Sequence, residues 1–326
     1  MTRMTGADRA GPCPGQRVEW PDRKRFAFSV FDDTDGDAIW NTQPVYRLLT
    51  ELGLRTTKSC WVRQPAPGEA ALCPGHTTED PEYRDYLLGL QGLGFEIGLH
   101  NVSSASSTRE QVRRGLEDFV RQFGHPPAVF ANHTGTRDSL YWGGERLTGL
   151  RRVLYKALTL FRNRGHFVGH VEGSEHFWGD LCRNQVRYVR NFTFRELDTL
   201  AVCPWMPYHD PSRPYVPAWF ASCDGHDVER FVAALSESNQ DALEAGGGCC
   251  IMYTHFASGF FADGRLHAEF ERLMRRLSRK SGWFVPVGRL LDHLAIRRGV
   301  AEIPSTERAR LEWKWLGQKL LMGGTT

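Results

Sequence analysis

Short apolar runs alternate along most of the chain with segments in which apolar residues recur at helical spacing. The apolar runs predict strands at residues 26–31, 56–62, 95–100, 128–130, 249–253 and 283–287. The helical spacing predicts helices at residues 44–52, 82–93, 107–123, 228–243, 267–277 and 289–296. Ser107 followed by Glu110 has the pattern of a capping box at the start of one of these helices. Strands that alternate with helices are typical of a parallel α/β fold.

Several of the predicted strands lead directly into acids or histidines. Asp32 and Asp33 follow the first strand, His100 ends the third, and His133 and His255 follow two later strands. In parallel barrels the functional residues gather at the carboxyl ends of the strands. We therefore expect these five side chains to lie close together at one end of the domain.

The middle of the chain has a less regular pattern. Residues 146–164 form a basic amphipathic stretch, and residues 177–217 are dense in aromatics, arginine and proline. We interpret about 140–220 as an aromatic-rich insertion that covers one end of the domain. The basic stretch either meets the phosphates of a nucleotide-linked or lipid-linked sugar or is a solvated helix face, and the second interpretation is favoured.

The two ends of the chain differ from the domain between them. Residues 1–21 are rich in glycine, proline and charge and predict a flexible tail, while residues 22–296 form the α/β domain. Residues 297–326 predict a C-terminal tail with an amphipathic helix. That helix docks on the domain, on a partner or on a membrane surface as a peripheral contact. Docking on the domain, or plain solvation, is the favoured interpretation.

Composition narrows the function classes. The chain has 326 residues, 41% of them hydrophobic and 24% charged, with a formal net charge of +3. These are ordinary values for a globular protein, and no nucleic-acid-binding module is recognisable. Its eight cysteines include no CxxC pair, which indicates reduced thiols. Because no apolar stretch resembles a signal peptide or a bilayer span, we expect a cytoplasmic protein with no transmembrane segment.

The first predicted strand runs into a segment with four acids, Phe31-Asp-Asp-Thr-Asp-Gly-Asp37. A calcium-binding EF-hand is excluded, because Ala38 stands where that loop needs glycine and Pro44 where it needs glutamate. Capping of the following helix would explain Asp35 or Asp37. It explains less well two adjacent acids directly after a buried strand. Carboxylates and imidazoles converging from separate strands are typical of a metal site.

Two of these segments resemble motifs of the polysaccharide deacetylases, the NodB-homology or carbohydrate esterase family 4 group. Phe31-Asp32-Asp33 resembles the first motif, and Glu96-Ile-Gly-Leu-His100 resembles the second. The resemblance implies a distorted (β/α) barrel of the glycoside hydrolase/deacetylase type. It further implies that Asp32 is the catalytic base and that Asp33 and His100 bind a divalent metal ion, expected to be Zn²⁺.

The later motifs depart from the family pattern. Ser104 replaces the second metal histidine, and the segment from Phe130 to Gly135 lacks the arginine that steadies the base. We hypothesise that His133, within that segment, is the third metal ligand; the alternative is a histidine hydrogen-bonded in the cleft. By resemblance, His255 after Met252-Tyr-Thr is the general acid, and either Asp224 or Asp227 orients it.

The resemblance implies removal of an N-acyl group, expected to be N-acetyl, from a sugar or activated sugar precursor in polysaccharide or glycoconjugate biosynthesis. The residues expected to bind substrate are Asn132, Thr134, Trp178, Tyr208, His209, Asp210 and Tyr253. The aromatic members of this set would otherwise be ordinary core residues.

Two alternatives remain open. Ser104 and the missing arginine motivate a catalytically degenerate relative that binds a glycan or a partner without turnover. The other alternative keeps the metal hydrolase but changes its substrate to a small amide or an N-formyl sugar. Metal content and product release separate these alternatives from the deacetylase.

Overall fold

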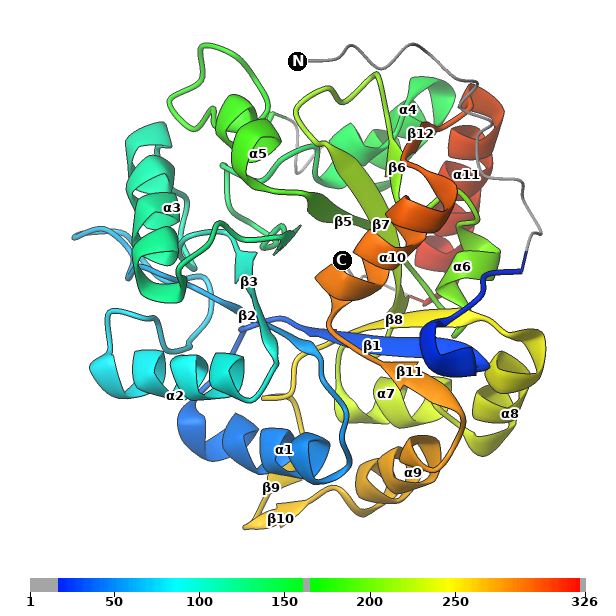
Figure 1. Cartoon of the computed structure of the whole chain (residues 1–326). Helices are drawn as coiled ribbons and strands as arrows, with labels where there is room; N and C mark the ends of the chain where they lie inside the picture. Colours follow the sequence, from blue (N-terminus) through cyan, green and yellow to red (C-terminus); the bar gives the residue numbers. More distant parts are fainter. Residues whose placement is uncertain (1–16, 161–164, 323–326) are drawn as a thin grey trace, which may run out of the picture.

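Seven parallel strands close into a barrel in the computed structural model, which describes residues 17–160 and 165–322 (Figure 1). The strands follow one another around the barrel as β1 (Phe26–Asp32), β2 (Thr57–Cys60), β3 (Glu96–His100), β4 (Val129–Ala131), β5 (Tyr188–Phe194), β7 (Ala218–Asp224) and β8 (Cys249–Thr254). The barrel closes where β8 pairs with β1, from Ala27 opposite Cys249 to Asp32 opposite Thr254. A short strand, β11 (Gly282–Phe284), pairs with the start of β1. The predicted distorted (β/α) barrel is confirmed.

Helices connect the strands around the outside. They are α1 (Ile39–Glu51), α2 (Pro81–Gly92), α3 (Arg109–Phe123), α7 (Val228–Ala234), α8 (Glu237–Gly246) and α9 (Ala268–Ser278), and a further helix, α10 (Val287–Arg298), follows β11. The capping box of α3 lies one residue later than predicted. Thr108, rather than Ser107, is the N-cap and exchanges hydrogen bonds with Gln111. The backbone N–H of Ser107 instead donates to the carboxylate of Asp138.

The single helix predicted at residues 228–243 is wrong, because α7 and α8 are separate helices. Ser236 breaks the pattern with an extended backbone, φ −48° and ψ 156°, and serves as the N-cap of α8. Gln240 donates its side-chain N–H to the carbonyl of Leu235, so this carbonyl at the end of α7 has a hydrogen-bond partner. The apolar periodicity runs across this break and therefore could not reveal it.

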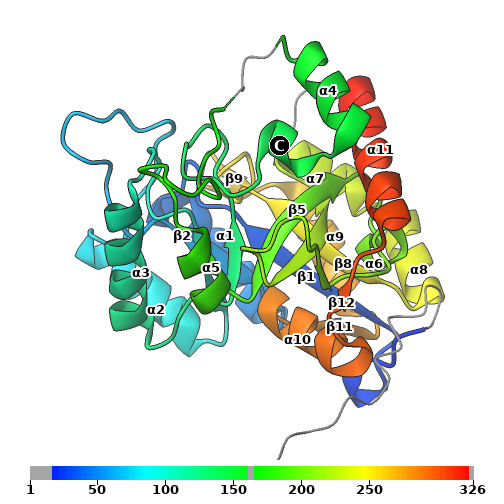
Figure 2. The same ribbon diagram turned by 90° about the horizontal axis from the view of Figure 1, so that it is seen from above.

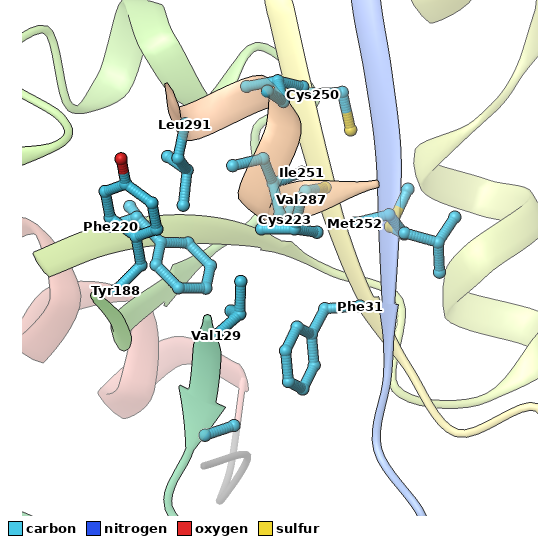
Figure 3. Close-up of a cluster of buried hydrophobic side chains, with 14 of the residues drawn as sticks. Phe31, Val129, Tyr188, Phe220, Cys223, Cys250, Ile251, Met252, Val287 and Leu291 are labelled. Carbon is cyan, nitrogen blue, oxygen red and sulfur yellow. The ribbon is translucent and has the colours of Figure 1, made fainter. Parts of the chain in front are cut away.

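One end of the barrel is filled by apolar side chains and closed by α10. Phe31, Phe220 and Ile251 from the strands lie beside Val287 and Leu291 of α10 (Figure 3). Figure 2 shows α10 beneath the strands. This end carries the amino termini of the strands, so the opposite, carboxyl end is the one left for a site.

The first turn of α10 is held by the starts of two strands. Its Val287 N–H donates to the hydroxyl of Thr57 at 2.8 Å, and its Gly288 N–H donates to the carboxylate of Glu96 at 2.9 Å. A Cβ on Gly288 would lie 2.1 Å from an oxygen of Glu96, so a larger residue here would displace the carboxylate that accepts from this turn.

The insertion predicted at about 140–220 needs correction, because β5 within it and β7 at its end are barrel strands. The remaining elements of this region are η2 (Gly143–Arg146), α4 (Gly149–Leu158), α5 (Gly179–Gln185), α6 (Thr199–Val202) and β6 (Tyr208–His209). Many of its aromatics are buried in the core. Of the basic stretch predicted at 146–164, residues 161–164 lie outside the described part of the chain.

The C-terminal region packs on the domain. β12 (Ala301–Glu302) pairs with β6, and α11 (Ser305–Met322) lies beside α4 and β5 (Figure 2). Leu311 and Trp315 of α11 are buried, which is consistent with docking on the domain. A hairpin of β9 (Phe261–Ala262) and β10 (Arg265–Leu266) and the short helix η1 (Pro21–Arg23) complete the elements. None of the described helices is long and apolar enough to cross a membrane.

The N-terminal tail predicted at residues 1–21 needs correction at its end, because residues 17–21 pack on the domain. Residues 1–16 lie outside the described part of the chain. Val18 and Trp20 are buried, and the indole N–H of Trp20 donates to the carbonyl of Gly247 at 3.2 Å. The chain from residue 17 onward therefore belongs to the packed domain.

Candidate active site

The turn after β1 lies at the carboxyl end of the barrel and brings Asp35 among three histidines. His100 Nε2 lies 3.2 Å and His133 Nε2 lies 3.5 Å from Asp35 Oδ1, while His255 Nε2 lies 3.4 Å from Asp35 Oδ2. His100 ends β3, His133 follows β4 and His255 follows β8. The three histidines predicted to meet do so, and the carboxylate at their centre is Asp35.

The second nitrogens of two rings fix how these histidines face Asp35. Nδ1 of His100 lies 3.1 Å from the carbonyl of Ala131, and Nδ1 of His255 lies 2.9 Å from the carbonyl of His226. Since a carbonyl only accepts, both Nδ1 atoms donate. The Nε2 of a neutral ring is then an acceptor facing another acceptor, the carboxylate. A proton or a cation must lie between such a pair.

Charges in the cluster shift its protonation. Burial, reinforced by the neighbouring His100, lowers the pKa of His133 to about 4, so this ring is neutral at pH 7. Burial would lower the pKa of His255, but the nearby Asp35 carboxylate and the charge of Asp33 raise it overall. Burial would raise the pKa of Asp35, but the charge of His100 and the close approach of the His100 and His255 rings hold it well below its usual range. His255, whose Nε2 faces Asp35 Oδ2, thus favours its protonated form.

Asp33 is held by an arginine that the sequence motifs did not reveal. Arg190 of β5 donates to the two oxygens of Asp33 at 2.9 and 2.5 Å, and both side chains are almost fully buried. The guanidinium also lies over the Tyr253 ring, 4.2 Å from its centroid. Asp33 Oδ2 is 3.9 Å from His100 Nε2. The segment from Phe130 to Gly135 has no arginine, as predicted, and β5 supplies Arg190 to Asp33 from within the region predicted to be an insertion.

Asp32 occupies a separate, fully buried ion-pair cluster. The Lys58 Nζ lies 3.3 Å from Asp32 Oδ2 and 2.8 Å from Asp37 Oδ2. The hydroxyl of Tyr46 and the backbone N–H of Phe256 donate to the two oxygens of Asp32 at 2.9 and 2.8 Å. Burial raises the pKa of Asp32 to about 6, against the opposing charge of Lys58. Both oxygens of Asp32 are thus used by protein groups.

Three of the predicted substrate residues lie at or near the mouth of the barrel. The hydroxyl of Tyr253 is 3.4 Å from His255 Nε2. Thr134, directly after His133, is exposed. Asn132 exchanges two hydrogen bonds with the backbone of Leu140, so its side chain holds the loop after β4.

The other four predicted substrate residues use their polar atoms inside the fold. Trp178 donates to the carbonyl of Asp138 at 2.6 Å, and Tyr208 accepts from Asn191 at 3.0 Å. His209 Nδ1 lies 3.2 Å from two backbone carbonyls, and Asp210 pairs with an arginine of α11 at 2.8 Å. These contacts match the interpretation that the aromatic residues are core.

His255 is oriented by a backbone carbonyl, and the prediction that Asp224 or Asp227 orients it is corrected. The Nδ1 of His255 donates to the carbonyl of His226. Asp224 instead accepts from Arg230 at 2.8 Å and lies 3.3 Å from His226 Nδ1. A peptide carbonyl can be supplied by any residue type, so the sequence could not identify it.

Ser104 stands where the motif has its second histidine, and the thiol of Cys73 lies near it. Ser104 is buried, and its carbonyl accepts the backbone N–H of Leu72 at 3.1 Å. Cys73, the next residue, places its Sγ 3.4 Å from His133 Nε2. Nothing in the sequence drew attention to Cys73, because it lies in a proline- and glycine-rich loop.

No protein-family profile and no curated protein matches the chain. Among solved structures, the chain is similar to a candidate polysaccharide deacetylase from Mycobacterium smegmatis, with a TM-score of 0.51 and 12% identity over 90% of this chain and 98% of the other. It is also similar to Puue allantoinase, with a TM-score of 0.51 and 14% identity over 91% and 99% of the two chains. The chain therefore has the barrel fold that these two proteins share, as its resemblance to the polysaccharide deacetylases implied.

Proposed function

We propose that the chain is a metal-dependent hydrolase that removes an N-acyl group, expected to be N-acetyl, from a sugar or sugar precursor. The spacing around Asp35 carries the proposal. Ligand atoms ~2.1 Å from a tetrahedral zinc ion lie ~3.4 Å from one another. Asp35 lies 3.2, 3.5 and 3.4 Å from the Nε2 atoms of His100, His133 and His255.

The donor set fits a divalent ion. Asp35 Oδ1 is buried and, within the described residues, has no hydrogen bond of good geometry, although two imidazole nitrogens face it. We assign Asp35, His100 and His133 as the residues that hold the ion, because the Nε2 atoms of both rings face Asp35 Oδ1 at 3.2 and 3.5 Å. The ligand atoms of Asp35 and His133 belong to a group that lies within 4.8 Å of one another, and His100, outside that group, would join them through its approach to Asp35. Two imidazoles beside one carboxylate favour zinc. A bound ion would polarise the acyl carbonyl and lower the pKa of a water molecule. His133 thus keeps the ligand role predicted for it, while Asp35 replaces Asp33.

Asp33 is better suited than Asp32 to act as the general base. The two N–H groups of Arg190 fix the Asp33 carboxylate, and its Oδ2 is 3.9 Å from His100 Nε2, beside the proposed metal site. A carboxylate held in this way can accept a proton from an attacking water. Asp32 is less suited to this role, because Tyr46, Lys58 and Phe256 already contact its oxygens.

His255 is proposed as the general acid. Its Nδ1–H donates to the carbonyl of His226, and its raised pKa favours a second proton on Nε2 beside Asp35. That proton can pass to the departing amine. The Tyr253 hydroxyl and the exposed Thr134 are placed to contact a substrate near His255.

The sugar substrate rests on the motif resemblance and on the shared fold. The two similar structures bear the names of a deacetylase and an allantoinase, both hydrolases of carbon–nitrogen bonds. Ser104, in place of the second motif histidine, is the observation that favours the alternative, a glycan- or partner-binding protein without turnover.

The test combines metal analysis with product release. Purified protein should contain about one divalent ion per chain and release acetate from N-acetylated sugars. N-formyl sugars and small amides are screened beside them to find the acyl group and the amine. A folded protein that binds glycan but neither metal nor acyl amides would instead be the non-catalytic binder.

A further inference from the structure

The loop between β2 and α2 is fastened to the turn that carries Asp35. The backbone N–H of Gly36 donates to the carbonyl of Pro74 at 2.8 Å, and that of His76 donates to the carbonyl of Asp37 at 2.9 Å. Between them, Gly75 passes so close to Trp61 that a Cβ would lie 2.5 Å from the indole ring. These contacts fix the backbone on the C-terminal side of Cys73.

Cys73 directs its sulfur toward the proposed metal site. Sγ of Cys73 is 3.4 Å from His133 Nε2, and the ligand atoms of Asp35, Cys73 and His133 all lie within 4.8 Å of one another. Among the residues that the structure describes, this is the one group of three or more potential ligands at such spacing. The His133 side chain is almost fully buried, and Asp35 Oδ1 is a buried atom without a well-formed hydrogen bond.

We propose that Cys73 is a protein ligand of the ion held by Asp35 and His133. This inference rests on the proposed function, because it requires the same ion. On binding, the thiol would release its proton to solvent and coordinate through the thiolate. Sulfur is a soft ligand and favours zinc over magnesium or manganese.

A sulfur ligand would have a chemical consequence for the site. Asp35, His100, His133 and Cys73 would provide four protein ligands, the number found in closed structural zinc sites, whereas catalytic sites keep one position for water or substrate. Water or substrate would then reach the ion only in place of the Cys73 sulfur.

Cobalt substitution tests the sulfur ligand directly. Metal-free protein is titrated with Co²⁺, which gives visible ligand-field bands when bound and a near-ultraviolet charge-transfer band when sulfur is a ligand. The wild type should show both, and Cys73→Ser should keep the visible bands, lose the charge-transfer band and bind Co²⁺ at least about 10-fold more weakly. Loss of an outer-shell partner alone already costs ~10–100-fold in affinity.

Alkylation provides a second measurement that does not need a variant. Of the seven free cysteines in the described residues, six are buried and Cys73 is partly exposed. Iodoacetamide should therefore label the Cys73 peptide of the native metal-free protein, and saturating Zn²⁺ should slow that labelling at least 10-fold. The acetamide adduct at Cys73 is quantified by peptide mass spectrometry.

The outcomes separate the two claims. Visible cobalt bands without a charge-transfer band, together with labelling that Zn²⁺ does not slow, would overturn the sulfur ligand and leave the metal hydrolase standing. Cys73 would then only hydrogen-bond to His133. A wild-type protein that binds no Co²⁺ at all would overturn both.

Discussion

Replacing Lys58 by methionine tests the buried ion-pair cluster that removes Asp32 from the proposed reaction. The Lys58 ammonium lies 3.3 Å from Asp32 and 2.8 Å from Asp37, and all three side chains are buried. Methionine has a similar length and no charge, so Lys58→Met leaves two carboxylates buried without their cation. The perturbation is thus electrostatic, with little change in packing.

Breaking a buried ion pair by removing one partner costs ~3–5 kcal/mol. At about 2 °C per kcal/mol for a chain of this size, the melting temperature should fall by ~6–10 °C. Lys314→Met is a matched control, because Lys314 pairs with Glu196 at 2.5 Å and both side chains are about a third exposed. Such an exposed pair contributes ~0–1 kcal/mol.

Thermal and urea unfolding followed by circular dichroism measure both variants. The triple variant Lys58→Met, Asp32→Asn, Asp37→Asn should recover part of the loss, because it removes the unpaired charges as well. If Lys58→Met unfolds at the same temperature as Lys314→Met, the cluster does not stabilise the protein as argued. The assignment of Asp32 to a structural role would then lose its basis.

Three further predictions address the proposed base, the pKa of Asp32 and the docking of α11. Asp33→Asn should lower kcat by ~10²–10⁴-fold with its metal content unchanged, whereas Asp32→Asn should keep most of the activity. If Asp32→Asn instead loses more activity than Asp33→Asn, Asp32 is the general base. The pKa of Asp32 is raised to about 6 in the folded protein, above the ~3.9 of an unfolded chain. The Asp32 carboxyl therefore contributes fully to folding stability below pH ~3.9, and this contribution is lost as the pH rises through about 6. The melting temperature of Asp32→Asn should therefore rise relative to wild type between pH 4 and pH 7, and a constant difference would contradict the raised pKa. Glu312 of α11 is fully buried and accepts from Arg151 at 2.6 Å and from the Thr148 N–H at 3.0 Å. Glu312→Gln should therefore lower the free energy of unfolding by ~3 kcal/mol and speed hydrogen exchange in α11. Unchanged exchange would refute the anchoring role of Glu312.

The part of the site that could be predicted follows from strand ends. A histidine or acid directly after an apolar run marks the carboxyl end of a buried strand, and parallel strands bring these ends together. That pattern predicts His100, His133 and His255 at the site. It could not choose among the acids after β1, because the turn at Gly36 decides which carboxylate faces the histidines.

The missed residues depend on contacts between distant segments. Arg190 and Lys58 each stand as a lone charge within a short buried strand, and their partners, Asp33 and Asp32, both belong to the first acidic segment. A buried charge needs a partner, so these lone charges were a usable signal, although the partner could not be named. The strand of Arg190 was hidden because its region is rich in aromatics and proline, which favoured an insertion over a barrel strand.

Zinc titration of metal-free protein tests most directly the claim that Asp35 organises a metal site. Calorimetry should show about one ion bound per wild-type chain. Asp35→Asn should bind at least about 10-fold more weakly, while Asp85→Asn, which changes an exposed acid on α2, should bind like wild type. Equal affinity of Asp35→Asn and wild type, or no binding by the wild type, would contradict the account.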